Sequence, residues 1–357
     1  MSPLSLSFGY LAKRYFKNLL IILLGLSFAF AMIDYFQYAQ RLSVAGNYKV
    51  LYAFYMWEQA LGLLYPLSIV FALIMTKIAL IKEHTMGIFY AFGYSTKALL
   101  APFLSVAFVV YALFSYLHTT EFSYAREKGA QLLKHQIGAY HVEHLFFKYN
   151  QTFVYINKLN PIEKKIEDIT LFEVRDDRVA STLHAPYALF NGNGWTAYDA
   201  IEKEHYYQKG ELVGFKVFHQ AEVKTLKGYK PKIIESLYEG KRLSVLDAYY
   251  AWRLLEKQGL NSSKMRAVLY YRVVVPLFAL ALMVILFFKI PFHERMMHLG
   301  LVMAWSLGVT FVVWGVLFGL HQMGLNGVVI PELTSLLPVI LLWLYALYLL
   351  FVKKEHL

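Results

Sequence analysis

The stretch IKEHTMGIFYAFGYS, residues 81–95, lies between two apolar runs that are each long enough to cross a membrane, residues 57–81 and 98–117. A link between two spans is ordinarily polar, but this one opens on charged residues and then turns apolar. Its second half has the i, i+3, i+4, i+7 spacing of one helix face: Met86, Phe89, Tyr90 and Gly93. The pattern predicts a short amphipathic helix at the membrane surface, over about residues 82–95.

Composition predicts a membrane protein. Of the 357 residues, 58% are hydrophobic and 17% are charged, whereas about 25% are charged in a soluble domain. The apolar residues are concentrated in six runs near the length of about 20 residues that a bilayer core requires. These runs cover residues 18–36, 57–81, 98–117, 267–288, 296–320 and 333–352. The net charge of +11 is typical of Lys and Arg beside spans, and we expect no nucleic-acid partner.

A polar region over residues 119–265 separates the third span from the fourth. It contains three short runs rich in β-branched and aromatic residues, at 153–159, 168–174 and 212–218, with turn-forming stretches between them. The predicted fold is therefore an α-helical polytopic membrane protein with six transmembrane helices and an inserted all-β, jelly-roll-like domain. Its parts are residues 1–118, 119–265 and 266–357.

A helix over residues 244–258 is predicted to return the chain to the membrane. Ser244 is its expected N-cap, and Gly259 stands where it should end. Its expected apolar stripe has five members: Val245, Ala248, Tyr249, Trp252 and Leu255.

The basic residues near the span ends predict orientation. One side of the membrane collects Lys13, Arg14, Lys17, Lys77, Lys82, Lys97, Lys289, Arg295, Lys353 and Lys354. Since basic residues favour the cytoplasmic side, we expect a multi-pass protein of the bacterial inner membrane with both termini in the cytoplasm. The region 119–265 would then lie outside.

Catalytic signals are weak. The chain has no phosphate-binding G-x-x-x-x-G-K-[ST] loop and no cysteine, so we expect a non-catalytic subunit without a cofactor, driven by a separate ATPase. The stretch HVEH, residues 141–144, could place two histidines on one helix face, but no further ligand is identifiable, and a solvated loop without metal is the expected reading. Lys77 is expected to extend toward the membrane surface, and Glu58 to face protein.

Several stretches in this order resemble the LptF/LptG permease family of the lipopolysaccharide exporter. They are AFGYS (91–95), the pattern TFVYINKLNP to GWTAYDA (152–200), the segment LSVLDAYYAW to RVVVPL (243–277) with Arg272 and Pro276, and KIPF (289–292). The stretch IDYFQYAQRL (33–42) is more similar to the LptG branch. The chain departs from the family at Thr85, where the coupling helix usually carries a glutamate eight residues before the glycine.

The resemblance implies a permease subunit that extracts lipopolysaccharide from the inner membrane and passes it to a periplasmic bridge. It implies four partners besides membrane lipid: a cytoplasmic ABC ATPase, a second six-span permease of the same family, a periplasmic β-rich bridge protein and lipopolysaccharide. It also implies an ATPase-coupling helix, and we expect five residues there to make the coupling contact: Glu83, Met86, Phe89, Tyr90 and Gly93. The first and fifth spans would gate a cavity between the two permeases.

Two further groups of residues are candidates for contact with the lipid. A basic rim for anionic lipid phosphates is expected at Arg41, Lys49, Arg266 and Arg272, with Asp34 or Glu58 as alternative partners of Arg272. Gate candidates are Asp34, Trp305 and Trp314. Two other functions stay open: a mechanotransmission protein that drives a periplasmic partner without moving a substrate, and a membrane enzyme acting on lipid.

Overall fold

The structure is a computed structural model. It describes residues 3–38, 40, 46–133, 141–150, 152–161, 163–176, 178–208, 211–239, 243–291 and 298–352, without the side chains of 3–5 and 236–239. The chain forms two compact units, a helical unit of Met1–Gly129 with Ser263–Leu357 and a β unit of Ala130–Ser262.

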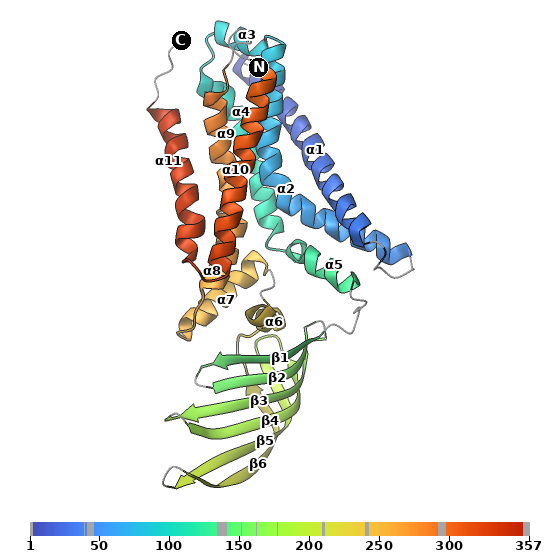
Figure 1. Cartoon of the computed structure of the whole chain (residues 1–357), viewed down its shortest axis with the longest axis vertical. Coiled ribbons are helices and arrows are strands. Elements are labelled where there is room, and N and C mark those ends of the chain that lie inside the picture. Colours follow the sequence, from blue (N-terminus) through green and yellow to red (C-terminus); the bar gives the residue numbers. More distant parts are fainter. Residues whose placement is uncertain are drawn as a thin grey trace. The chain divides into compact units, whose positions relative to one another are not determined.

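The helical unit contains the predicted spans (Figure 1). Its long elements are α1 (Pro3–Tyr38), α2 (Gly46–Lys82), α4 (Thr96–Leu117), α8 (Ser263–Val273), α9 (Leu277–Lys289), α10 (Leu299–Leu325), the π-helical turn η4 (Glu332–Leu336) and α11 (Leu337–Phe351). Five described helices are long and apolar enough to cross a membrane, and the bent pair of α8 and α9 makes a sixth. When the bent pair is counted as one broken span, the number of spans is the predicted six.

The fourth span is broken because of its sequence. Pro276 stands directly before α9 and has no N–H with which to continue the hydrogen-bond pattern of α8. The two helices meet at an angle of 42°. Proline therefore divides the span into α8 and α9, and the second of these is apolar up to its last residue, Lys289.

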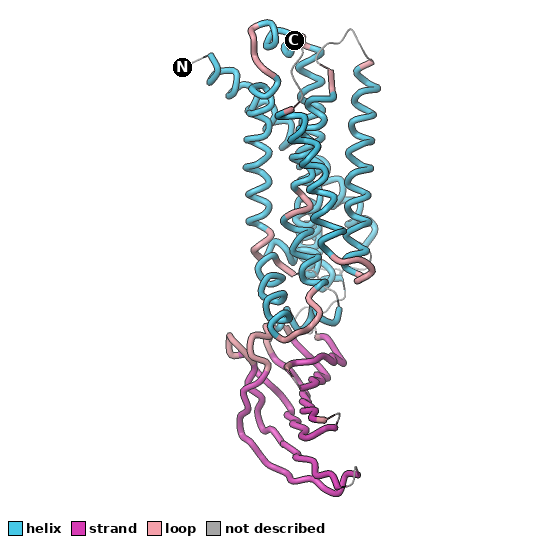
Figure 2. Tube along the Cα trace, turned by 90° about the vertical axis from the view of Figure 1, so that its left-hand side faces the viewer, coloured by secondary structure: helices cyan, strands magenta, loops and turns pink. Residues whose placement is uncertain are grey.

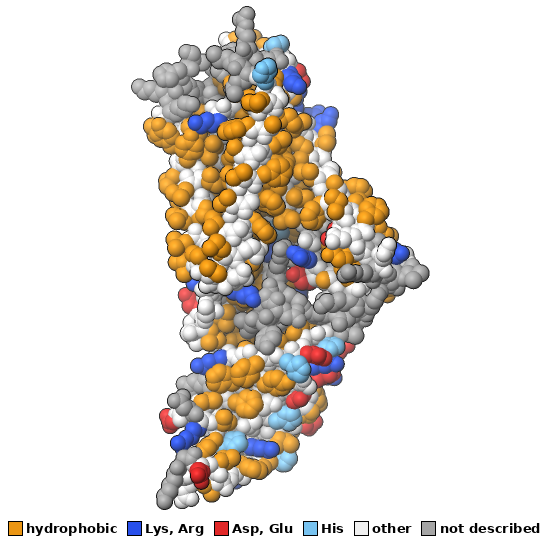
Figure 3. Space-filling view, in the orientation of Figure 1, with side chains coloured by type: hydrophobic (Ala, Val, Ile, Leu, Met, Phe, Trp, Pro, Cys, Tyr) orange, Lys and Arg blue, Asp and Glu red, His pale blue; other side chains and the backbone are white. Residues whose placement is uncertain are grey.

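The core of the helical unit is built around α2 and α9. In the most apolar stretch of α2, 83% of residues are buried, compared with 22% in α1 and 22% in α10. The outward faces of these less buried helices are apolar, and hydrophobic side chains cover the visible face of the unit (Figure 3). A surface of this kind is suited to lipid or to another membrane subunit.

The β unit is built on one curved antiparallel sheet (Figure 2). Its strands are β1 (Val142–Tyr149), β2 (Thr152–Asn160), β3 (Lys165–Arg175), β4 (Arg178–Phe190), β5 (Trp195–Gln208) and β6 (Glu211–Thr225). The predicted inserted β domain is confirmed, and the three predicted runs lie in β2, β3 and β6. The strands follow chain order, so the described sheet is a meander without the crossover connections of a full jelly roll.

One end of the sheet is closed by a buried aromatic cluster. Trp195 is fully buried, and its indole N–H donates to the carbonyl of Tyr229 at 2.7 Å. The hydroxyl of Tyr229 donates to Gln258 at 2.8 Å, and burial raises the pKa of this tyrosine to about 12. These contacts join the sheet to the segment that follows β6.

Two helices follow the sheet, α6 (Pro231–Glu239) and α7 (Val245–Lys257). The N-cap prediction for α7 is confirmed, since the Ser244 hydroxyl accepts from the backbone N–H of Asp247 at 3.1 Å. The buried face of α7 consists of Ala248, Ala251 and Leu255. Tyr249, expected in the apolar stripe, is instead 40% exposed. Helix α6 was not predicted from the sequence.

Candidate functional site at the short helix α3

A short helix, α3 (Thr85–Ala91), connects α2 to α4 at the end of the helical unit where α1 begins (Figure 1). It is shorter than predicted because the chain turns sharply on both sides. His84 has a left-handed backbone with φ of 57°, and Gly93 has φ of 79°. The N–H of Gly93 donates to Tyr90 and that of Tyr94 to Phe89, which is the paired pattern of a glycine-terminated helix. Both bends hold α3 in a defined direction.

The start of α4 is fixed by its own cap. The Ser95 hydroxyl accepts from the backbone N–H of Ala98 at 3.2 Å. Gly93 and Ser95 thus lie between the end of α3 and the start of α4.

The face of α3 that we expected to bind a partner is turned inward. Met86 is fully buried, and Phe89 and Tyr90 are partly buried against the core of the helical unit. The Tyr90 hydroxyl lies 3.2 Å from that of Thr96. Met86 is therefore wrong as a docking residue, since its side chain is in contact with the chain's own core and has no exposed surface to offer.

The outward face of α3 is apolar as well. Ile88 is 52% exposed, and Phe92, directly after the helix, is 78% exposed. Neither residue was among the predicted contacts, because the i, i+3, i+4 set was expected to be the functional face. Apolar residues also stand at positions 88 and 92, one turn apart, and this was the signal that could have identified them.

A groove of about 790 Å³ lies beside this face. It is lined on one side by Leu6, Ser7 and Tyr10 of α1, and on the other by residues of α3 and the turn after it, including Ile88, Phe92 and Tyr94. Its walls are mainly apolar or aromatic. The groove and the exposed face of α3 together form a surface that an apolar side chain of a partner can enter.

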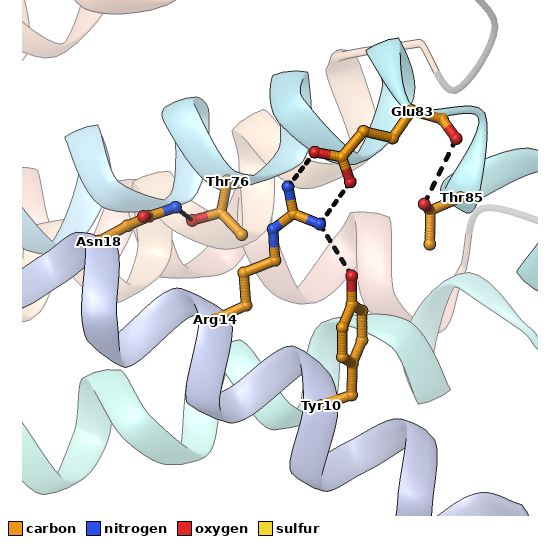
Figure 4. Close-up of polar contacts among 6 residues, drawn as sticks. All are labelled: Tyr10, Arg14, Asn18, Thr76, Glu83 and Thr85. Carbon is orange, nitrogen blue, oxygen red and sulfur yellow. Dashed lines mark hydrogen bonds and ion pairs between the residues drawn. The ribbon is translucent and has the colours of Figure 1, made fainter.

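Glu83, in the turn before α3, forms an ion pair with Arg14 of α1 (Figure 4). The guanidinium donates to both carboxylate oxygens, with Nη1 to Oε2 at 2.5 Å, and Nη1 also donates to the hydroxyl of Tyr10 at 2.8 Å. Hydrogen bonding to Arg14 holds the pKa of Glu83 below its usual range. The carboxylate that we expected at the coupling contact is thus bound within the chain.

Thr85, which stands at the family's usual glutamate position, is close to this pair. Its hydroxyl lies 3.5 Å from the carbonyl of Glu83 (Figure 4). A threonine cannot supply the charge of a glutamate. The negative charge of this turn belongs to Glu83, two residues before Thr85, and its carboxylate is paired with Arg14 of α1.

The predicted basic rim is not brought together as one site. Arg41 lies outside the described residues, and Lys49 is a partly exposed residue of α2. Arg266 pairs with Glu332, which also accepts from the Tyr270 hydroxyl at 3.1 Å. Arg266 thus joins α8, the first half of the broken span, to the start of the last span.

Arg272 is a buried residue with partners inside the protein. It is 8% exposed, lies 3.0 Å from Nδ1 of His118, and donates to the hydroxyl and carbonyl of Ser123 at 3.0 and 3.3 Å. The expectation that Asp34 or Glu58 is its partner is wrong in this structure.

The gate candidates occupy different surroundings. Asp34 accepts a 2.5 Å hydrogen bond from Tyr52 of α2. Trp305 is 53% exposed on α10, whereas Trp314 packs against the core and stacks on Phe318. Of the three, Trp305 is the one whose exposure allows contact with a second membrane component.

Lys77 contradicts the expectation that it extends toward the membrane surface. It is 1% exposed, and its Nζ donates to the carbonyls of Phe287 and Ile290, the latter at 2.7 Å. It also lies 4.4 Å from the centre of the Phe287 ring. Its ammonium group satisfies backbone acceptors at the end of α9, so it has no need to reach water.

The HVEH stretch is the start of strand β1, where a loop was expected. His141 pairs with Glu143 at 3.0 Å, and Nδ1 of His144 lies 2.8 Å from the Tyr155 hydroxyl of β2. In the part of the chain that the structure describes, no group of three or more His, Cys, Asp or Glu side chains is arranged to hold a metal. His135 lies outside the described residues.

Comparison with known proteins shows to which family these features belong. A search among curated proteins gives no match. The family model for the lipopolysaccharide export system permease LptF/LptG matches residues 9–351, which include the β unit and all of the candidate spans except the first residues of α1. That description covers both branches, so the assignment to LptG stays a prediction. The chain belongs to the LptF/LptG family of lipopolysaccharide export permeases.

Proposed function

We propose that this chain is a transmembrane subunit of an ATP-driven exporter that extracts lipopolysaccharide from the inner membrane and passes it to a periplasmic bridge protein. Family membership supplies the substrate class. The observation that carries the coupling part of the proposal is the outward apolar face of α3, Ile88 and Phe92, beside the groove at the start of α1.

The ATPase is a separate protein that binds α3. The chain lacks a phosphate-binding loop, so ATP hydrolysis must come from a partner. An exposed aromatic side chain on a rigid, short helix can insert into a groove of such a partner, and burying it removes a large apolar surface from water. The anchored inner face of α3 allows it to move the spans when the partner moves.

A second permease covers part of the exposed apolar surface of α1 and α10. Both helices bury only 22% of their most apolar stretch within this chain. A multi-acyl lipid needs a wide apolar wall, and two facing permeases supply one. Trp305 on α10 is exposed on such a wall.

The β unit transfers the lipid to the bridge protein through strand addition. In the described sheet, β1 and β6 are the edge strands, with backbone groups available to pair with another chain. We place the termini in the cytoplasm and the β unit outside, as the distribution of basic residues indicates.

Co-purification from the native membrane tests the coupling part. The wild-type chain should retain an ABC ATPase and a second six-span protein in mild detergent. Phe92→Asp should release the ATPase and keep the second permease, because it places a charge in the docking contact. Phe215→Asp is the matched control, since Phe215 is a 57% exposed phenylalanine of the β unit. Full ATPase recovery with Phe92→Asp and Ile88→Asp would contradict docking at α3.

A further inference from the structure

Polar contacts join α1 to α2 at several levels of the helical unit. Asn18 donates to Thr76 at 2.8 Å, and Tyr15 donates to the carbonyl of Ile69 at 2.9 Å. Farther along are Trp57 with Ser27 at 3.0 Å and Tyr52 with Asp34 at 2.5 Å. From Asn18 through Ser27 to Asp34 along α1, the partners run back from Thr76 through Trp57 to Tyr52 along α2.

These contacts make α1 and α2 an antiparallel pair with a fixed register. Between membrane helices, hydrogen bonds of this kind favour one alignment because sliding would leave polar groups without partners in an apolar environment. Two of the contacts, Asn18 with Thr76 and Arg14 with Glu83, lie near α3 (Figure 4). Of these two contacts, only that of Arg14 with Glu83 involves a residue outside α2.

Glu83 lies in the turn between α2 and α3, one residue after α2 ends and two before α3 begins. Its bidentate contact with Arg14 therefore connects α1 to the turn that carries α3. A fork of two parallel N–H donors fixes both the distance and the relative direction of the two groups. Displacement of the turn is then transferred to the guanidinium, and through it to the start of α1.

The pair contributes little to folding stability. The Arg14 side chain is 23% exposed and that of Glu83 is 49% exposed, and ion pairs with this much access to water add little to folding stability. Its geometry is nevertheless specific, since Tyr10 holds the guanidinium from a third side at 2.8 Å. A contact that is directional but weakly stabilising is suited to transmit movement.

We propose that Arg14 and Glu83 form a mechanical link that transmits movement of α3 to α1 during transport. The inference rests on the proposed function, in which an ATPase moves α3 and α1 borders the lipid path. It assigns Arg14 as a positioning residue: it acts on α1 without contacting ATP or lipid.

Arg14→Met tests the link with three readouts on the complete complex: ATPase co-purification, ATP hydrolysis and ATP-dependent release of lipopolysaccharide from proteoliposomes. Co-purification and hydrolysis should stay at the wild-type level, while release falls about tenfold, in the range of a lost coupling contact. Lys17→Met is the matched control, because Lys17 is an exposed basic residue of the same helix, and it should leave release unchanged.

Rescue variants separate a link from a general effect of charge. Arg14→Lys should keep part of the release, since an ammonium group attracts the carboxylate without the two-point geometry. The exchange Arg14→Glu with Glu83→Arg should restore more release than either single change. Normal release by Arg14→Met would overturn the inference, and so would a loss of release matched by an equal loss of folded complex. If the wild-type complex releases no lipopolysaccharide, the proposed function itself fails.

Discussion

The ammonium group of Lys77 in α2 donates a 2.7 Å hydrogen bond to the carbonyl oxygen of Ile290, the residue that directly follows α9. A second hydrogen bond goes to the carbonyl of Phe287. The last carbonyls of a helix lack partners within the helix and carry partial negative charge. Lys77 therefore caps the C-terminal end of α9 and connects it to α2.

Replacing Lys77 by methionine should lower the stability of the helical unit. Methionine keeps the length and apolar stem of the side chain but leaves two buried carbonyls without a donor, and an unsatisfied buried acceptor costs about 1–3 kcal/mol. Thermal unfolding in detergent measures the change, with Lys82→Met at an exposed position of the same helix as control. A Lys77→Met variant as stable as wild type would show that the cap is dispensable.

Arg272 should act through structure, and its loss should be visible without any transport assay. Its contacts to His118 and Ser123 are buried, and a charged hydrogen bond contributes about 1.5–3 kcal/mol. Arg272→Ala should therefore reduce both yield and melting temperature, while Arg253→Ala, an exposed arginine of α7, changes neither. Loss of lipid release by an Arg272→Ala variant of normal stability would instead support the lipid-phosphate role that the sequence predicted.

The Arg14–Glu83 link should not respond to pH near neutrality. Because the folded-state pKa of Glu83 is lowered, the contribution of the pair is fully present above the usual glutamate pKa of about 4.3 and is lost only as pH falls through the lowered value. The ratio of lipid release by wild type to that by Glu83→Gln should therefore be constant from about pH 6 to pH 8. A ratio that approaches one at the acidic end of this range would mean that Glu83 is protonated there and that the pair is not formed as described.

Strand β6 is the edge that we expect to receive the bridge protein. It has 15 residues against eight in β1, and its exposed apolar residues include Leu212, Val213 and Phe215. Photo-crosslinkers along β6 should capture a β-rich soluble protein more often than crosslinkers in β3, which pairs with strands on both sides. Preferential capture along β1 would assign the handover to the opposite edge.

Sequence patterns predicted the features that depend on local residues. The cap at Ser244 was correct, since it depends on neighbours within about one helical turn of the chain. The apolar runs were found, but α1 and α2, with 36 and 37 residues, extend well beyond the predicted spans 18–36 and 57–81. The inner face of α3 was misjudged because both of its faces are apolar, so periodicity could not distinguish core from surface. At a membrane boundary, exposed apolar residues are normal.

The partners of the buried charges could not be predicted from patterns. Arg272 contacts residues 149 and 154 positions earlier in the chain, and Lys77 contacts residues more than 200 positions later. Only the packed arrangement of the helices brings these groups together. The same holds for Arg14 and Glu83, which are 69 positions apart in the chain and come into contact because α1 packs beside α2.

The central claim is that ATP hydrolysis by a bound partner drives lipopolysaccharide out of the membrane through this permease. The direct measurement is release of lipopolysaccharide from proteoliposomes that contain the purified complex, with the soluble bridge protein as acceptor. If the claim holds, transfer requires ATP and is abolished by Phe92→Asp. ATP hydrolysis by an intact complex that moves the β unit but transfers no lipid would contradict it and would favour mechanotransmission.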